Sequence, residues 1–115
     1  MEIDIQHRPS YSLAIVKLAA SERIRADSGS MVSYSDGLEI ETKAEGGFLK
    51  SLGRAVLGRE SFFQNFWKAG PNGGELTLAP DLPGDIILIE MKGAPMLVQS
   101  GSYLASENGV DIEAK

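Results

Sequence analysis

The chain has 115 residues, the length of one domain, and such a domain buries roughly two thirds of its unfolded surface. Its 43% hydrophobic and 23% charged residues are ordinary for a globular protein, and its net charge of −5 argues against nucleic-acid binding. There is no cysteine, which excludes disulfides and thiolate metal sites and is compatible with the cytoplasmic location that we expect. No apolar run approaches the ~20 residues of a membrane span.

The first predicted elements are two short strands near the N-terminus. Residues 2–5 read EIDI and residues 13–16 read LAIV, with a turn around Pro9 between them. Short apolar runs bounded by turn residues, here residues 13–16 and the later run IILI at 86–89, are typical of strands that are buried on both faces.

Residues 28–43, SGSMVSYSDGLEIETK, predict a β-hairpin around an Asp-Gly dipeptide. Apolar and charged residues alternate over 38–43, the period of a half-buried strand. A three-residue loop at 35–37 pairs Val32 with Ile40, whereas a two-residue loop would place Val32 opposite a glutamate. We therefore predict the three-residue loop.

The next segment, residues 44–74, occurs once. Its apolar spacing predicts one short helix or a loop at 46–58, followed by an aromatic strand at 62–68 and a glycine-rich hairpin loop at 70–74. It is also the cationic part of the chain, because four basic residues at 46–69 accompany one acidic residue.

The remaining chain repeats its beginning with a period of about 72 residues, so that residues 75–115 correspond to residues 2–43. ELTL at 75–78 corresponds to EIDI, IILI at 86–89 to LAIV, and SGSYLASENGVDIEAK at 100–115 to the predicted hairpin. The repeat predicts a single all-β domain over 1–115, either a short double-stranded β-helix or a β-sandwich.

The second copy ends where the first continues into its aromatic strand. A sheet left open at that point exposes an unpaired edge, and proteins normally cover or pair such edges. We therefore expect a homo-oligomer, or a chain that is the N-terminal part of a longer repeat protein.

The stretches SGSMVSYSDGLEIETK, GGFLKSLGRAVLGRESFFQNFW, GGELTLAPDLPGDIILIEM and GSYLASENGVDIEAK together resemble the family named after altered inheritance of mitochondria. The resemblance spans nearly the whole chain. It implies an all-β fold similar to the tryptophan RNA-binding attenuator protein, internal repeats and symmetric oligomers. Mitochondrial members are implicated in inner-membrane organisation. The resemblance implies no catalytic residue or ligand site, and members usually have roughly twice this length.

Isolated polar residues offer no catalytic set. His7 is the only histidine, so the usual zinc and cupin-like sites are not expected, and we interpret it as a turn residue. Ser28, Ser30, Ser100 and Ser102 have no histidine near them in sequence and lie outside any G-x-S-x-G motif. We interpret these serines as parts of turns.

Two acidic pairs, Glu39 with Glu41 and Asp111 with Glu113, each share one face of a predicted strand. They could bind a cation or act as paired carboxylates. The simpler interpretation is a solvated strand face, on which a lysine accompanies each pair. We therefore predict a protein that is not an enzyme and has no metal or cofactor.

One segment carries a positive functional signal. Aromatic and aliphatic residues lie among cations there, a composition typical of a partner-binding or membrane-surface segment. The alternative is that the aromatic residues fill the core while the cations face water. The candidate residues are Phe48, Leu49, Lys50, Leu52, Arg54, Arg59, Phe62, Phe63, Phe66 and Trp67.

The leading hypothesis is a non-enzymatic, oligomeric β protein that acts as a scaffold. The alternatives are a small-molecule-binding ring similar to the attenuator protein, and a peripheral membrane protein that binds through residues 46–69.

Overall fold

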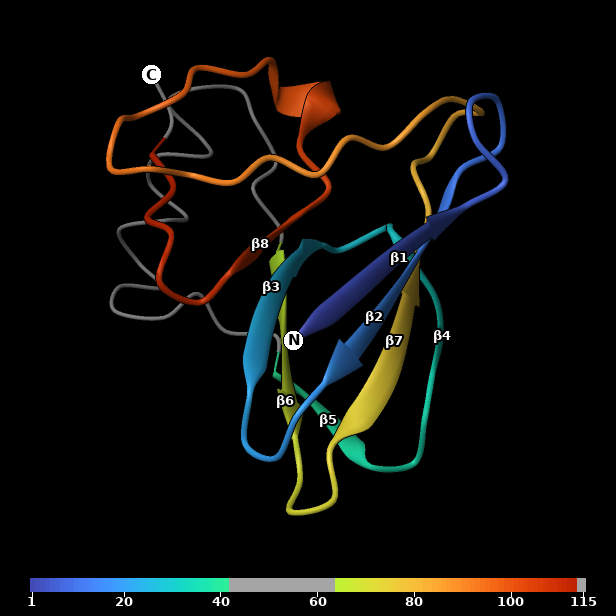
Figure 1. The fold of residues 1–115 in the computed structure, drawn as a ribbon, viewed down its shortest axis with the longest axis vertical. Coiled ribbons are helices and arrows are strands. Elements are labelled where there is room, and N and C mark those ends of the chain that lie inside the picture. Colours follow the sequence, from blue (N-terminus) through green and yellow to red (C-terminus); the bar gives the residue numbers. More distant parts are fainter. Residues whose placement is uncertain (42–63, 114–115) are drawn as a thin grey trace.

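The computed structural model describes residues 1–41 and 64–113, and this part of the chain is all-β, as the sequence predicts. Eight strands form two antiparallel four-stranded sheets, and one turn of 3-10 helix spans Ser100–Ser102 (Figure 1). The helix or loop predicted at 46–58 lies outside the described residues.

The first sheet has the strand order β1-β2-β7-β4. Its strands are β1 (Glu2–Gln6), β2 (Leu13–Leu18), β7 (Gly74–Leu78) and β4 (Met31–Tyr34). The runs EIDI, LAIV and ELTL therefore all form strands. The alternating burial of β2 leaves one of its faces half-buried or exposed, so the prediction that this strand is buried on both faces is wrong.

The second sheet has the strand order β5-β6-β3-β8. Its strands are β5 (Leu38–Glu41), β6 (Gln64–Ala69), β3 (Arg23–Asp27) and β8 (Ala105–Glu107). The aromatic strand is thus confirmed as β6, with its centre shifted by two residues or fewer. Strand β3, whose sequence RIRAD is highly charged, carries no clear signal in the sequence.

The core lies between the two sheets. Each strand that contributes to it directs alternate residues into it, which is the side-chain period of a strand. Strands β6 and β7 also bury a residue of their opposite face, Phe66 and Thr77. The first sheet contributes Ala14, Val16, Leu18, Leu76 and Leu78, and the second contributes Ile24, Ala26, Leu38, Trp67 and Ala69.

The hairpin predicted around residues 35–37 is wrong, because β4 and β5 belong to different sheets. The turn itself is present, since the Leu38 amide donates a hydrogen bond to the Ser35 carbonyl at 3.1 Å. However, β4 pairs with β7, and Ile40 of β5 pairs with Trp67 of β6. With this pairing Leu38 lies in the core.

The glycine-rich connection at 70–73 also crosses between sheets and is not the predicted hairpin loop. It lies against the other crossing, because the Gly70 amide donates to the Gly37 carbonyl at 2.9 Å. Gly73 has φ 74° and a Cβ there would collide with the Leu18 carbonyl oxygen. Only a residue without a side chain fits this contact.

The second repeat copy does not form the same elements as the first. Residues 86–89, which correspond to part of β2, are not a strand, and neither are residues 110–113, which correspond to part of β5. The predicted strands at these two places are therefore wrong. A strand needs backbone partners, and within residues 1–41 and 64–113 neither segment pairs with a neighbouring strand.

One part of the sequence repeat is matched by the way the strands pair. Strands β1 and β7 flank β2 on its two sides, and both are antiparallel to it. Lys17 is opposite Glu2 on one side and Glu75 on the other, and Val16 is likewise opposite Ile3 and Leu76. These are the residues that the sequence repeat aligns.

Three glycine substitutions test the close packing of the connection at 70–73. Gly73→Ala should be the most destabilising because it adds both a positive-φ penalty and the collision with backbone. Gly93→Ala should cost about 1–2 kcal/mol, since Gly93 has φ 88° but open space around its Cα. Gly101→Ala, with nothing within 4 Å and no positive φ, is the control. Urea unfolding measures the three free energies, and equal values for the first two would contradict the packing described here.

Candidate functional site

The predicted partner surface is only partly described. Eight of its ten residues lie within 42–63, outside the described residues, and the other two are on β6. Phe66 is 2% exposed and Trp67 is fully buried. These two side chains therefore offer no surface to a partner in this structure, and the remainder of the surface stays a prediction.

Trp67 lies in the core between the sheets. Its neighbours in register are Ile24 on β3 and Ile40 on β5. From the first sheet, the Tyr34 ring meets it with centroids 4.8 Å apart at an angle of 53°. Trp67 therefore fills the core, which is the role that the sequence pattern left open as the alternative to partner binding.

Phe66 lies on the opposite face of β6, where two arginines of β3 cover it. The Arg25 guanidinium is 4.9 Å and that of Arg23 5.6 Å from the centre of its ring. Arg25 Nη1 also donates to the Val110 carbonyl at 3.0 Å. The hydroxyl of Tyr103, whose pKa is raised by burial, lies 3.3 Å from the Arg25 carbonyl and donates to it. These contacts attach the C-terminal residues to the second sheet.

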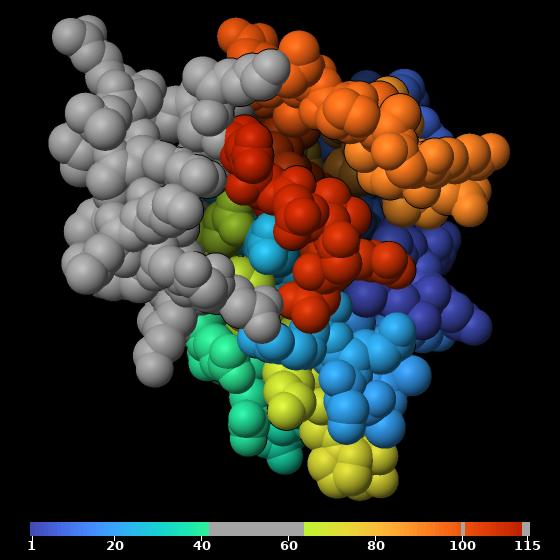
Figure 2. Space-filling model, turned by 90° about the vertical axis from the view of Figure 1, so that its left-hand side faces the viewer, coloured from blue at the N-terminus to red at the C-terminus, as the bar shows by residue number. Residues whose placement is uncertain are grey.

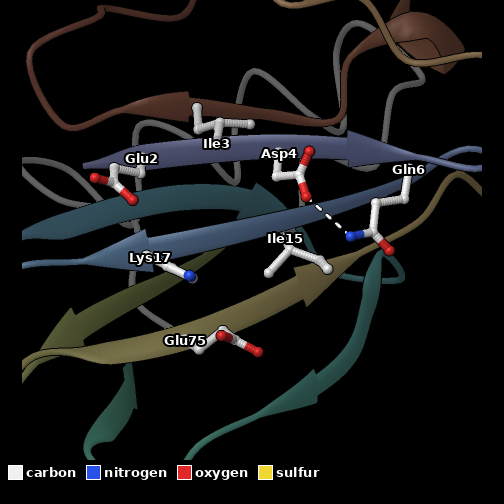
Figure 3. A pocket seen from close by; sticks show the side chains of 7 residues that line it. All are labelled: Glu2, Ile3, Asp4, Gln6, Ile15, Lys17 and Glu75. Atoms are coloured by element: carbon white, nitrogen blue, oxygen red, sulfur yellow. Dashed lines mark hydrogen bonds between the residues drawn. The ribbon is translucent and has the colours of Figure 1, made fainter.

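A shallow cavity of about 470 Å³ lies on the outer face of the first sheet. Figure 3 shows Lys17 between Glu2 and Glu75, one residue from each of three neighbouring strands. Gln6 donates a hydrogen bond to Asp4 at 2.9 Å on its rim. The lining is Glu2, Ile3, Asp4, Gln6, Ile15, Lys17 and Glu75.

This cavity has the chemistry of a solvated sheet face. Ligand pockets are usually enclosed and mostly apolar, with a few polar groups, whereas four of these seven side chains are charged. In the described part of the chain, no three His, Cys, Asp or Glu residues are placed to hold a metal ion. The cavity contains no histidine or hydroxyl that could act as base or nucleophile.

Three of the other polar residues considered for catalysis lie in turns or make contacts within the fold. His7 is exposed in the turn after β1 with φ 61°. Ser30 is buried, and its hydroxyl donates to the Asp27 carbonyl at 2.7 Å. Glu41 pairs with Arg23 at 3.2 Å on the outer face of the second sheet.

An ion-pair cluster that the sequence did not reveal joins two distant turns. Arg8 donates two hydrogen bonds to Asp85, at 2.9 and 3.0 Å, and the Ser12 hydroxyl donates a third at 2.7 Å. The guanidinium and the hydroxyl hold the pKa of the Asp85 carboxyl far below its usual value. The partners are 77 and 73 residues apart, so no local pattern could indicate them.

The cluster anchors the start of an exposed segment, which we name the apolar segment (residues 86–98, IILIEMKGAPMLV). After the half-buried Ile86, its large apolar residues are exposed, among them Ile87 at 71%, Leu88 at 62% and Leu97 at 79%. Figure 1 shows the segment in orange, running past the ends of the strands, and Figure 2 shows it at the margin of the molecule. The prediction that residues 86–89 are buried is therefore wrong for the chain alone.

These features define an all-β protein with two facing antiparallel sheets and, within its described residues, no recognisable catalytic or metal-binding set. The chain belongs to the mitochondrial biogenesis AIM24 family, whose model matches residues 3–115. The family predicted from the sequence is thereby confirmed.

Two streptococcal proteins are similar to this chain. An uncharacterised protein of Streptococcus pyogenes serotype M6 is 27% identical over 120 residues, covering 98% of this chain and 48% of the relative. A crystal structure of a Streptococcus pyogenes protein matches with a TM-score of 0.62 and 26% identity, covering 80% of this chain and 43% of that one. The chain thus spans about half the length of both proteins. In its described part, no helix is long and apolar enough to cross a membrane.

The Asp85 cluster generates a pH-dependent prediction. A carboxyl whose pKa is lowered in the folded state stabilises the fold above its ordinary value of 3.8, and this stabilisation is lost as the pH falls through the folded value. Asp85→Asn should therefore lower the melting temperature at pH 7, and its difference from wild type should shrink below about pH 4. Thermal unfolding at pH 7, 5 and 3 measures this difference.

The control is Asp36→Asn, which removes an exposed carboxylate from the turn between β4 and β5. We expect it to change the melting temperature little at any of the three pH values. An Asp85→Asn protein whose melting temperature equals that of wild type at pH 7 would show that the cluster does not stabilise the fold.

Proposed function

We propose that this chain is a non-enzymatic β protein whose biochemical role is assembly, as one protomer of a homo-oligomeric scaffold. The observation that carries the proposal is the exposed apolar segment. Monomeric soluble proteins rarely expose contiguous apolar patches of more than a few hundred Å², and larger ones mark interaction sites.

The energetics favour covering this segment. Burial of one exposed Leu or Ile side chain stabilises by about 1.5–3 kcal/mol. Ile87, Leu88 and Leu97 are each more than 60% exposed, so the segment offers several such contributions to an interface. The ordering of side chains and the loss of rotational freedom on association oppose this gain in free energy. An interface therefore needs more than one apolar contact.

In this proposal the family fold is a short double-stranded β-helix with two copies of the repeat. Support comes from the pairing of β1 and β7 with β2 in the same register, in which Glu2 and Glu75 both lie opposite Lys17. The second copy would complete its strands when a neighbouring chain supplies backbone partners. A cytoplasmic location is part of the proposal and agrees with the absence of cysteine.

The two alternative functions have less support from the described residues. The cavity on the first sheet is open and highly charged, unlike an apolar ligand pocket. A thermal-shift screen with amino acids and nucleotides tests the ligand alternative, because a ligand at 100 times its Kd adds about 2.7 kcal/mol. Vesicle co-sedimentation of a variant with Lys50, Arg54 and Arg59 changed to Glu tests the membrane alternative.

Assembly is measured by light scattering coupled to size exclusion, over a range of concentrations. The wild-type chain should be larger than a monomer. Ile87→Ser and Ile89→Ser should each weaken association about tenfold or more, because each removes about 1.5–3 kcal/mol of apolar burial from the interface.

The matched control is Val32→Ser, which removes an apolar side chain of similar exposure (56%) from β4, outside the apolar segment. It should leave association unchanged. A well-folded wild-type monomer at all concentrations would refute the assembly function.

A further inference from the structure

We propose that residues 86–91 of one copy form a strand that pairs, antiparallel, along the free side of β1 in a neighbouring copy. This inference rests on the proposed assembly and specifies its interface. The occupant of the apolar segment is thus a second copy of this chain, bound head-to-tail through its sheet edge.

Strand β1 has a side available for pairing. It is the terminal strand of the first sheet and pairs with β2 alone among the described strands. Its inward side chains, Ile3 and Ile5, are only half-buried, in contrast to Leu76 and Leu78 of β7 at 0% and 1%. An edge with half-buried isoleucines is a template for a further strand.

Backbone directions show which groups that side presents. The Glu75 carbonyl accepts from Ser35 and so faces β4. Because successive residues of a strand face opposite neighbours, Leu76 faces β2, and Val16 opposite it faces β7. The adjacent Lys17 then faces β1, and its partner Glu2 on β1 faces β2 in return. Ile3 and Ile5 therefore direct their amide and carbonyl groups to the free side.

The repeat identifies the strand that would fit there. Ile3 corresponds to Leu76, and β7 uses Leu76 and Leu78 to pair with β2. The segment that corresponds to β2 is residues 86–91, which has no partner strand in the described chain. Transferring the register of β2 on β7 places Ile89 opposite Ile3 of the neighbouring copy and Leu88 opposite its Asp4.

The side chains suit this position. Three isoleucines and one leucine at 86–89 have a high preference for strands. In the transferred register, Ile87 and Ile89 take the inward places that Ala14 and Val16 occupy in β2. They would then cover Ile5 and Ile3, which the isolated chain leaves half-buried.

Such a contact joins two different surfaces, so it repeats from copy to copy. A head-to-tail interface of this kind closes into a ring when the rotation between copies permits. A contact of the apolar segment with itself across a two-fold axis would instead stop at a dimer. The two arrangements therefore differ in which residues come together.

Engineered cysteines test the register in the 115-residue chain, which has no cysteine of its own. Asp4→Cys protein and Leu88→Cys protein are mixed under oxidised glutathione. Opposite residues in an antiparallel pair have Cβ atoms about 4.5–5.5 Å apart, close to disulfide reach, and closest where the pair is not hydrogen-bonded, as here. We expect a disulfide-linked heterodimer in the mixture and little linkage in either protein alone.

The control mixture contains Asp4→Cys and Leu97→Cys, because Leu97 is the more exposed residue but lies outside the proposed strand. Linkage as strong as that through Leu88 would overturn the register. Linkage of Leu88→Cys to itself would show a two-fold contact and overturn the head-to-tail arrangement. If the protein is an oligomer but no disulfide-linked heterodimer forms, this inference is overturned and the proposed assembly remains. If the protein is a monomer, the inference and the proposed assembly are both overturned.

A charge reversal provides an independent test. The transferred register places Glu90 opposite Glu2 of the neighbour, and like charges directly opposite one another destabilise a strand pair. The corresponding residue of β2 is Lys17, which lies between two glutamates. Glu90→Lys should therefore tighten association by a few fold at low salt, while Glu107→Lys, an exposed control on β8, should not. Weaker association of Glu90→Lys would overturn the register.

Discussion

The contact between the two sheets around Trp67 is the interaction on which the rest of the structure depends. A tryptophan buries about 150–250 Å², and at about 25 cal/mol per Å² this stabilises the fold by roughly 4–6 kcal/mol. Its indole NH is buried and has no hydrogen-bond partner among the described residues, which costs about 1–3 kcal/mol. Burial therefore exceeds the cost, and Trp67 holds the second sheet against Tyr34 and the apolar face of the first.

This packing brings two of the chain's crossings between the sheets together at one place. The connections at 35–37 and 70–73 cross between the sheets in contact with each other, and their backbones approach closely because Gly37 and Gly73 carry no side chains. The crossing places Leu38 in the core and directs β5 to β6. The paired crossings thus convert a chain of short strands into two facing layers.

The two halves of the repeat then have different surroundings. Strand β2 is covered by β1 and β7, and its inward residues are buried. The corresponding segment at 86–89 has the same apolar character but no strand beside it among the described residues, and its side chains face solvent. Residues 86–89 thus have a sequence suited to the interior of a sheet but lie on the surface. This is the feature of the fold on which the proposed assembly rests.

Much of the fold could be predicted from residue patterns, because period-two alternation and turn residues are local signals. They revealed the all-β class, strands at 2–5, 13–16 and 38–41, and the aromatic strand. The family was indicated separately, by the resemblance of four longer stretches of the sequence. The local signals did not reveal β3, whose arginines lie half-buried against Phe66, because those contacts depend on a partner strand 37 to 45 residues away along the chain. Of the candidate partner surface, only Phe66 and Trp67 are described, and both are buried.

The sequence by itself determined most of the segments that form strands and where the chain turns, because each of these signals lies within a few consecutive residues. Only the tertiary structure decided which strands pair, that the turn at 35–37 joins two sheets, and that Arg8 meets Asp85. Pairing depends on the competition among all strands for backbone partners and a common core. That competition is settled by contacts between residues far apart in the chain, which no local pattern records.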